Sequence, residues 1–134
     1  MDYPVIARFY LRRAKHALLK RDPRSLFYAA FELRCCVEAR QAEYAEALEA
    51  LKGTKIRPWN VGDTGKRIRK NSMASSITLM RMKFPDGSEY SSYHTPVTDE
   101  LIGVVERDLN PLLHCQTVYR KQQDVWWDEV RGKL

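Results

Sequence analysis

Polar side chains interrupt a long, largely apolar stretch between residues 24 and 51, and they are the first candidates for chemistry. Glu38 can reach Arg34 across one helical turn, and Arg40 stands where the apolar pattern would place a hydrophobic residue. Charged groups in such positions are usually satisfied by partners, so the favoured interpretation is a structural ion-pair network. The alternative is a polar pocket between helices that His114 enters from the last helix, because histidine can exchange a proton near neutral pH.

Other site chemistries lack the residue spacing that they need. None of the three histidines pairs with a cysteine or carboxylate at a ligand-like spacing, and the adjacent Cys35 and Cys36 point in different directions from a helix. The glycines between residues 53 and 65 do not form the GxxxxGK[ST] pattern of a phosphate loop. The cysteines sit on apolar faces, where the nucleophilic thiolate is disfavoured. We therefore expect no metal site and no cofactor.

The densest basic run follows in a segment that is rich in glycine. It consists of four cations, with Lys55 and Arg57 some way before them: Lys66, Arg67, Arg69 and Lys70. The net charge of the whole chain is +6, which permits contact with nucleic acid or another polyanion. A solvated charged face is the favoured interpretation of such a run, and the main polyanion contact is the alternative.

One helix is expected to organise the chain, from Arg24 to Leu51. Asp22 can cap its start, Pro23 suits its first position, and Gly53 ends it. An antiparallel helix from Pro4 to Lys20 precedes it across this short turn. The apolar seam of the long helix recurs at spacings of four and three residues: Leu26, Ala30, Leu33, Val37, Tyr44, Ala47 and Leu51.

The remaining elements are shorter. A short helix is possible from Thr64 to Asn71, and residues 76–93 favour a β-hairpin around an Asp-Gly turn, with a helix over residues 75–83 as the alternative. A third helix opens at Thr95-Pro96, and Asn110-Pro111 is expected to interrupt it. A final helix should then run to about Arg131, with its inward residues at Leu112, Cys115, Tyr119, Trp126 and Val130.

Length and composition bound the class of protein. The 134 residues suffice for one domain, residues 1–134, and 44% hydrophobic with 30% charged content is typical of a soluble globular protein. No window approaches the roughly 18 uninterrupted apolar residues of a membrane span. The first residues lack the pattern of a secretory signal, so we expect a cytoplasmic protein with reduced thiols.

The segment FYLRRAKHALLKRDPRSLFYAAFELRCCVEAR resembles the first helix pair of HEPN-like domains, whose second helix has the form AAxELRxxxEA. The resemblance extends over residues 7–48 and, more loosely, over residues 105–117. It implies a helical module of prokaryotic defence or toxin-antitoxin systems, with an antitoxin or a nucleotidyltransferase as a possible protein partner. Many family members are metal-independent ribonucleases with an Arg/His motif, which Arg107 and His114 match in spacing. Other members are inactive and bind partners.

These observations predict a mainly α protein, an antiparallel bundle of four to five helices with a basic linker and a small β-hairpin. The leading hypothesis is a HEPN-like binding module that contacts RNA, a nucleotide or a protein partner. The first alternative is an endoribonuclease in which Arg107 holds the scissile phosphate and His114 transfers the proton. The second is a dimeric interaction module with no nucleic-acid role. A homodimer is expected because Val5, Phe9 and Leu19 lie off the main stripe of the first helix.

Overall fold

The computed structural model of the protein describes residues 3–53, 55–56, 60–71, 77–114 and 116–134. It is mainly helical with one two-stranded antiparallel sheet, which confirms the predicted fold class. No helix in these ranges is long and apolar enough to cross a membrane. The elements in chain order are α1 (Ala7–Leu18), α2 (Pro23–Lys52), α3 (Val61–Asn71), β1 (Thr78–Lys83), β2 (Glu89–His94), α4 (Asp99–Val104), the π-helical turn η1 (Val105–Leu109), α5 (Asn110–Leu113) and α6 (Trp126–Lys133).

The long helix α2 begins and ends at the residues that the sequence indicates. The side chain of Asp22 accepts a hydrogen bond from the backbone N–H of Ser25 at 3.0 Å, and Pro23 occupies the first helical position. Gly53 follows the helix with a φ of 67°, a left-handed conformation that glycine adopts without steric cost. Because both ends are set locally, α2 matches the predicted helix to within one residue at either end.

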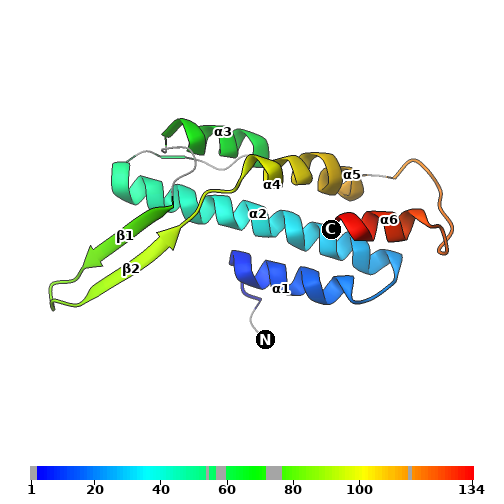
Figure 1. Ribbon diagram of the computed structural model, residues 1–134, viewed down its shortest axis with the longest axis horizontal. Coiled ribbons are helices and arrows are strands. Elements are labelled where there is room, and N and C mark those ends of the chain that lie inside the picture. The colour runs from blue at the N-terminus through cyan, green and yellow to red at the C-terminus, as the bar shows by residue number, and fades with distance from the viewer. Residues whose placement is uncertain (1–2, 54, 57–59, 72–76, 115) are drawn as a thin grey trace.

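The core lies along α2, which runs through the length of the molecule with α1 on one side and α3, α4 and α5 on the other (Figure 1). One buried cluster joins the first half of α2 to the later helices: Leu26, Ala30, Val61, Ile102, Val105, Leu109, Leu112 and Val130. A second cluster joins its last turns to α3: Tyr44, Ala45, Leu48, Ile56 and Ile68. Because α1 packs antiparallel against α2, the bonds between these parts of the chain range from Ser25 with Lys20 at the turn to Ala7 with Glu43 at the far end.

The predicted break at Asn110-Pro111 is wrong, because the chain passes from α4 through η1 into α5 without leaving the helix. A proline lacks the N–H that would bond the preceding turn, and its ring crowds that turn. The π-helical turn changes the bonding just before Pro111, where the N–H of Asn110 bonds to the carbonyl of Val105, five residues back. The wider turn thereby accommodates the proline.

The predicted final helix is also wrong over most of its length. The chain leaves the helix at His114, whose ψ is 165°, and becomes helical again only in α6. Tyr119, which was expected to face the core, is 90% exposed, whereas Val130 is buried as expected. Cys115 lies outside the described residues. Tyr119 in the segment between α5 and α6 therefore lies at the surface instead of in the bundle interior.

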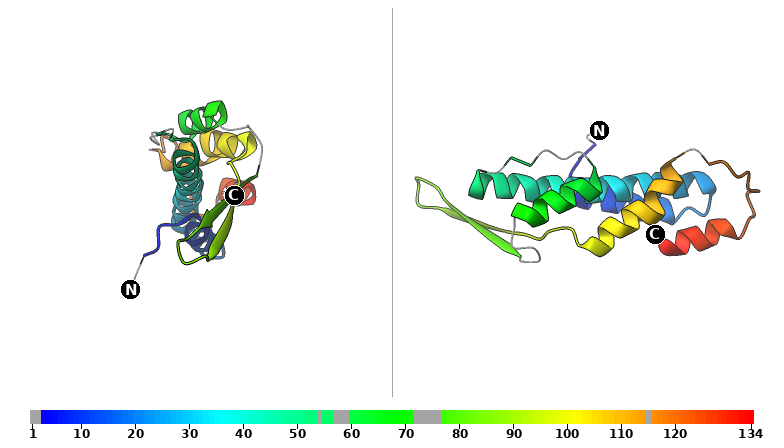
Figure 2. Two further views of the ribbon diagram at one scale, coloured as in Figure 1. Left: turned by 90° about the vertical axis from the view of Figure 1, so that its left-hand side faces the viewer. Right: turned by 90° about the horizontal axis from the view of Figure 1, so that it is seen from above.

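The hairpin of β1 and β2 confirms the prediction from the Asp-Gly turn, and the alternative helix over residues 75–83 is wrong for the part of that segment that the structure describes. Gly87 has a φ of 84°, as a tight turn at this position requires. The hairpin projects away from the helices (Figures 1 and 2). Only its base is covered: Met80 is buried, whereas Met82 and Tyr90, which are directly opposite each other, are 40% and 52% exposed.

Candidate functional site

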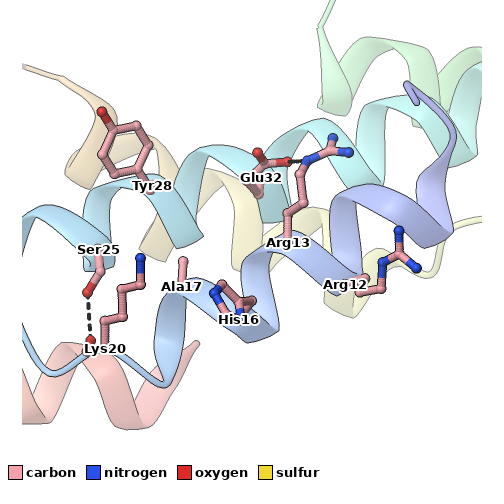
Figure 3. Close-up of a pocket in the computed structure, with 8 residues that line it drawn as sticks. All are labelled: Arg12, Arg13, His16, Ala17, Lys20, Ser25, Tyr28 and Glu32. Atoms are coloured by element: carbon pink, nitrogen blue, oxygen red, sulfur yellow. Dashed lines mark hydrogen bonds and ion pairs between the residues drawn. The ribbon is translucent and has the colours of Figure 1, made fainter. Parts of the chain in front are cut away.

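A groove of about 480 Å³ lies between α1 and α2 near the turn that joins them. Figure 3 shows cationic side chains from α1 on one side and residues of α2 on the other. The lining residues are Arg12, Arg13, His16, Ala17, Lys20, Ser25, Tyr28 and Glu32.

Three basic side chains form the α1 side of the groove. Arg12, His16 and Lys20 follow one another at a spacing of four residues, so they share one face of the helix. Lys20 stays in line beyond the end of α1 because its N–H bonds to the carbonyl of Ala17 at 3.1 Å. All three basic side chains are exposed. The guanidinium of Arg12 also stacks over the ring of Phe9, 4.5 Å from its centre.

The inner wall of the groove contains a carboxylate, but its charge is compensated. Glu32 is buried, with a side chain that is 10% exposed, and it accepts a hydrogen bond from Arg13 Nε at 2.9 Å. Its other oxygen accepts a hydrogen bond from the hydroxyl of Tyr3 at 2.5 Å, and this bond raises the pKa of Tyr3. The remaining cations, Arg12 and Lys20, therefore set the charge of the groove.

Arg13 is held on several sides. Its guanidinium lies 3.9 Å from the ring centre of Tyr3 and 4.6 Å from that of Tyr10. Its Nη1 donates to the carbonyl of Pro4 at 2.9 Å, while Nη2 is buried with no acceptor among the described residues. The N-terminal residues and the helix pair thus form one rigid wall around a cation.

An aromatic ring completes the groove on the α2 side. Tyr28 is 67% exposed, and Ser25 nearby donates its hydroxyl proton to the carbonyl of Lys20 at 2.6 Å. That bond ties the end of α1 to the start of α2 and fixes the spacing of the two walls. Cations suited to phosphate groups and an exposed ring suited to stacking therefore meet in one hollow.

The polar residues predicted in α2 are engaged with neighbours. Arg34 Nε and Glu38 Oε1 lie 2.9 Å apart, as their spacing predicts. Arg40 bonds to Glu43 at 3.0 Å and to the hydroxyl of Thr95 at 2.7 Å. These contacts fit the structural ion-pair interpretation, because each arginine ties α2 to its own next turn or to the segment after β2.

The structure places the two residues of the predicted catalytic pair in different surroundings. Arg107 is 72% exposed in η1 and lies 3.6 Å from Asp108; a small hollow of about 160 Å³ there is lined by Arg107, Asp108 and Pro111 among others, but not by His114. His114 is exposed at the end of α5, and among the described residues its hydrogen bonds are made by its backbone N–H and carbonyl. The alternative interpretation placed it in a polar pocket with Arg34 and Glu38, but its side chain is exposed where the helix ends. The catalytic role of the pair stays a prediction.

The predicted basic run lies on α3. Lys66, Arg67 and Lys70 are exposed, whereas Arg69 is half-buried and forms an ion pair with Asp99 at the start of α4. Lys55 is exposed too, and Arg57 lies outside the described residues. The run is thus a charged face, and one of its members serves to join two helices.

Metal and thiol chemistry find no geometric support in the described part of the chain. No cluster of three or more His, Cys, Asp or Glu side chains there could hold a metal ion. Burial raises the pKa of both Cys35 and Cys36, which lowers their thiolate fraction.

No protein-family model, no curated protein and no solved structure matches the chain. The groove therefore has to be judged on its own geometry. Sequence reasoning missed it, although the spacing of Arg12, His16 and Lys20 was the available signal. The signal is incomplete because the opposite wall comes from α2, and only the packing of the two helices brings Tyr28 and Glu32 against it.

Proposed function

We propose that the protein is a helical binding module that holds the phosphate groups of RNA or of a nucleotide in the groove between α1 and α2. The observation that carries the proposal is that the basic side chains of Arg12, His16 and Lys20 line the same hollow of about 480 Å³ as the exposed Tyr28. Cations that follow a phosphate backbone, combined with rings on which bases stack, are the usual means of binding single-stranded nucleic acid. Arg13 supports the proposal by neutralising Glu32, which would otherwise repel phosphate.

A binding assay with separate variants of the two basic surfaces tests the proposal. α1 and α3 lie on opposite sides of α2, so the two surfaces can be altered independently (Figures 1 and 2). The groove variant is Arg12→Ala with Lys20→Ala, and its control is Lys15→Ala, an exposed cation of α1 that does not line the groove. The α3 variant is Lys66→Ala with Lys70→Ala, which leaves the Arg69–Asp99 ion pair in place.

Fluorescence anisotropy of a labelled single-stranded RNA dodecamer gives the affinity of each variant. We expect the groove variant to bind about tenfold more weakly or worse, and the control to bind like the unaltered protein, because only groove contacts release counterions. A loss of affinity in the α3 variant alone would show that RNA binds at α3 and not in the groove. The absence of binding to both RNA and mononucleotides would remove the proposal.

The exposed hairpin favours a second candidate function, a homodimeric interaction module. Met82, Phe84 and Tyr90 are 40%, 47% and 52% exposed, and Val5 and Leu19 at the two ends of α1 are 63% and 79% exposed. Apolar surface of this kind is typical of protein contacts. Sedimentation of the unaltered protein should give the mass of two chains, and Met82→Ser with Phe84→Ser should shift it toward one. A single-chain mass for the unaltered protein at micromolar concentration contradicts this candidate.

The ribonuclease alternative with Arg107 and His114 draws its support from the HEPN-like resemblance alone. The same is true of a role in defence or in a toxin-antitoxin pair. Incubation of labelled RNA without divalent metal is the direct test: cleavage that His114→Ala abolishes would support the alternative, and intact RNA with the unaltered protein would oppose it.

A further inference from the structure

A second hollow, of about 610 Å³, lies on the other flank of the start of α2. Its walls come from the first residues of α2 and from the segment that leads into α6. The lining residues are Asp22, Pro23, Arg24, Tyr119, Arg120, Gln122 and Trp127.

The far end of the chain is fastened to the α1–α2 turn. Arg131 of α6 donates to the carbonyl oxygens of Leu18, Lys20 and Asp22 at 3.2, 2.9 and 3.3 Å. The bond to Leu18 satisfies a carbonyl at the end of α1 that has no helical partner, and the other two bond to the turn that leads into α2. They also hold α6 against the α1–α2 turn and thereby fix the position of one side of the hollow relative to the other.

The wall of the hollow contributed by α6 is fixed by Trp127. Its indole N–H donates to the carbonyl of Lys121 at 2.9 Å, and its ring meets Phe27 of α2 edge to face at 5.8 Å between ring centres. A long aromatic side chain thus links the connecting segment to the core. The hollow is a built part of the fold.

The hollow offers the same kinds of groups as the groove. Arg24 is exposed, Tyr119 is 90% exposed, and the guanidinium of Arg120 stacks on Trp126 at 3.9 Å from the ring centre. The one carboxylate among its lining residues is Asp22, which is engaged in capping α2, and the hydrogen bond from the backbone of Ser25 lowers its pKa. An exposed arginine, an exposed ring and the half-buried Arg120, which also donates to the carbonyl of Val118, therefore lie beside a carboxylate that is already bonded.

One ridge of α2 contributes a residue to each hollow. Tyr28 lines the groove and Arg24 lines the second hollow, and these exposed residues are four apart, so they are neighbours on one face of the helix. A chain of phosphates that left the groove past Tyr28 would reach Arg24, and with it the hollow that Tyr119 and Arg120 also line. Both hollows thus offer cations and an exposed ring.

We infer that the ligand is a single RNA strand several nucleotides long, which crosses this ridge and occupies both hollows. The inference rests on the proposed function of the groove and adds a second contact region with Tyr119 as a stacking platform. Each hollow has a volume in the range of about 300–1,000 Å³ that suits a small ligand, so each can take a nucleotide unit. The inference favours a single strand over duplex RNA, because the bases of a duplex are already stacked on one another and do not stack on Tyr119.

The length dependence of binding tests the inference. Labelled uridine dinucleotide and labelled oligouridylate dodecamer are titrated with the full-length protein and with Tyr119→Ala. The dodecamer is expected to bind the unaltered protein much more tightly than the dinucleotide. In Tyr119→Ala it should lose about tenfold in affinity, the effect of one stacked base, while dinucleotide binding stays the same. The matched control is Tyr93→Ala, a tyrosine of β2 that is 69% exposed and should change neither affinity.

The outcomes separate this inference from the function on which it rests. Equal affinities for dinucleotide and dodecamer, or a dodecamer affinity that Tyr119→Ala leaves unchanged, overturn the second contact region. If the groove variant Arg12→Ala with Lys20→Ala still weakens binding in that case, the proposed function stands alone. The inference is also overturned if a duplex RNA competitor displaces the labelled dodecamer as effectively as the unlabelled single strand does.

Discussion

Replacement of Glu32 by glutamine tests how the inner wall of the groove holds the helix pair together. Glutamine keeps the shape of the side chain but removes the negative charge of the carboxylate, whose two oxygens accept hydrogen bonds from Arg13 and Tyr3. Breaking a buried ion pair costs about 3–5 kcal/mol, because the partner charge is left uncompensated. The side chain of Arg13 is 23% exposed, so solvent relieves part of this cost. We therefore expect the free energy of unfolding to fall by about 2–3 kcal/mol.

Thermal and urea unfolding, followed by circular dichroism, measure this loss. For a chain of this size it corresponds to a fall in Tm of roughly 10 °C. Glu46→Gln is the matched control, since Glu46 is an exposed carboxylate of the same helix. It should leave Tm nearly unchanged. Tyr3→Phe removes one of the two bonds to Glu32 and should give a smaller fall than Glu32→Gln.

The same variant should bind RNA more tightly, because Arg13 then faces the groove without a compensating carboxylate. Lower stability together with higher affinity is therefore the expected signature. An unchanged Tm would refute the structural role assigned to the Glu32 carboxylate. Weaker RNA binding in a variant that remains folded would refute the electrostatic argument for the groove.

Two further predictions concern the fold. The hydrogen bond from the backbone of Ser25 lowers the pKa of Asp22 in the folded protein, so the stability that this carboxylate contributes is present above the unfolded pKa of about 3.9 and is lost as pH falls through the lower folded value. Asp22→Ala should therefore lower Tm at pH 7 and flatten the dependence of Tm on pH in this acid range. An equal fall in Tm at every pH would contradict this prediction. A Cβ on Gly65 would lie 2.4 Å from Ile102 Cδ1, whereas a Cβ on Gly132 would meet nothing within 4 Å. Urea unfolding should therefore show that Gly65→Ala lowers the free energy of unfolding by about 1–3 kcal/mol, while Gly132→Ala leaves it unchanged or raises it slightly. Equal effects of the two substitutions would show that α3 packs on α4 more loosely than described.

Local sequence signals predicted the parts of the fold that local bonds determine. Asp22 and Pro23 set the start of α2 and Gly53 its end, since capping depends on residues within one turn. The hairpin followed from its turn residues in the same way. The prediction of a break at Pro111 was wrong because a π-helical turn, which residue propensities do not indicate, lets the helix continue past a proline that lacks an N–H.

The site was harder to predict than the elements, since it depends on how separate helices pack. Arg34 and Glu38 pair within one helix, so their spacing was sufficient. Tyr28 lines one hollow with Arg12 and His16 only because α1 and α2 pack antiparallel at a particular register, which no local pattern encodes. The hollow beside Arg24 depends in turn on α6 docking through Arg131, more than a hundred residues away in sequence.

The salt dependence of RNA affinity tests the central claim, that the groove binds phosphate, most directly. For single strands each phosphate contact contributes about 0.7 to the slope of log affinity against log salt concentration. The account predicts that Arg12→Ala with Lys20→Ala reduces this slope by about 1.4 relative to Lys15→Ala, because two contacts are removed. An equal slope in both variants would contradict it, since Arg12 and Lys20 would then contact no phosphate.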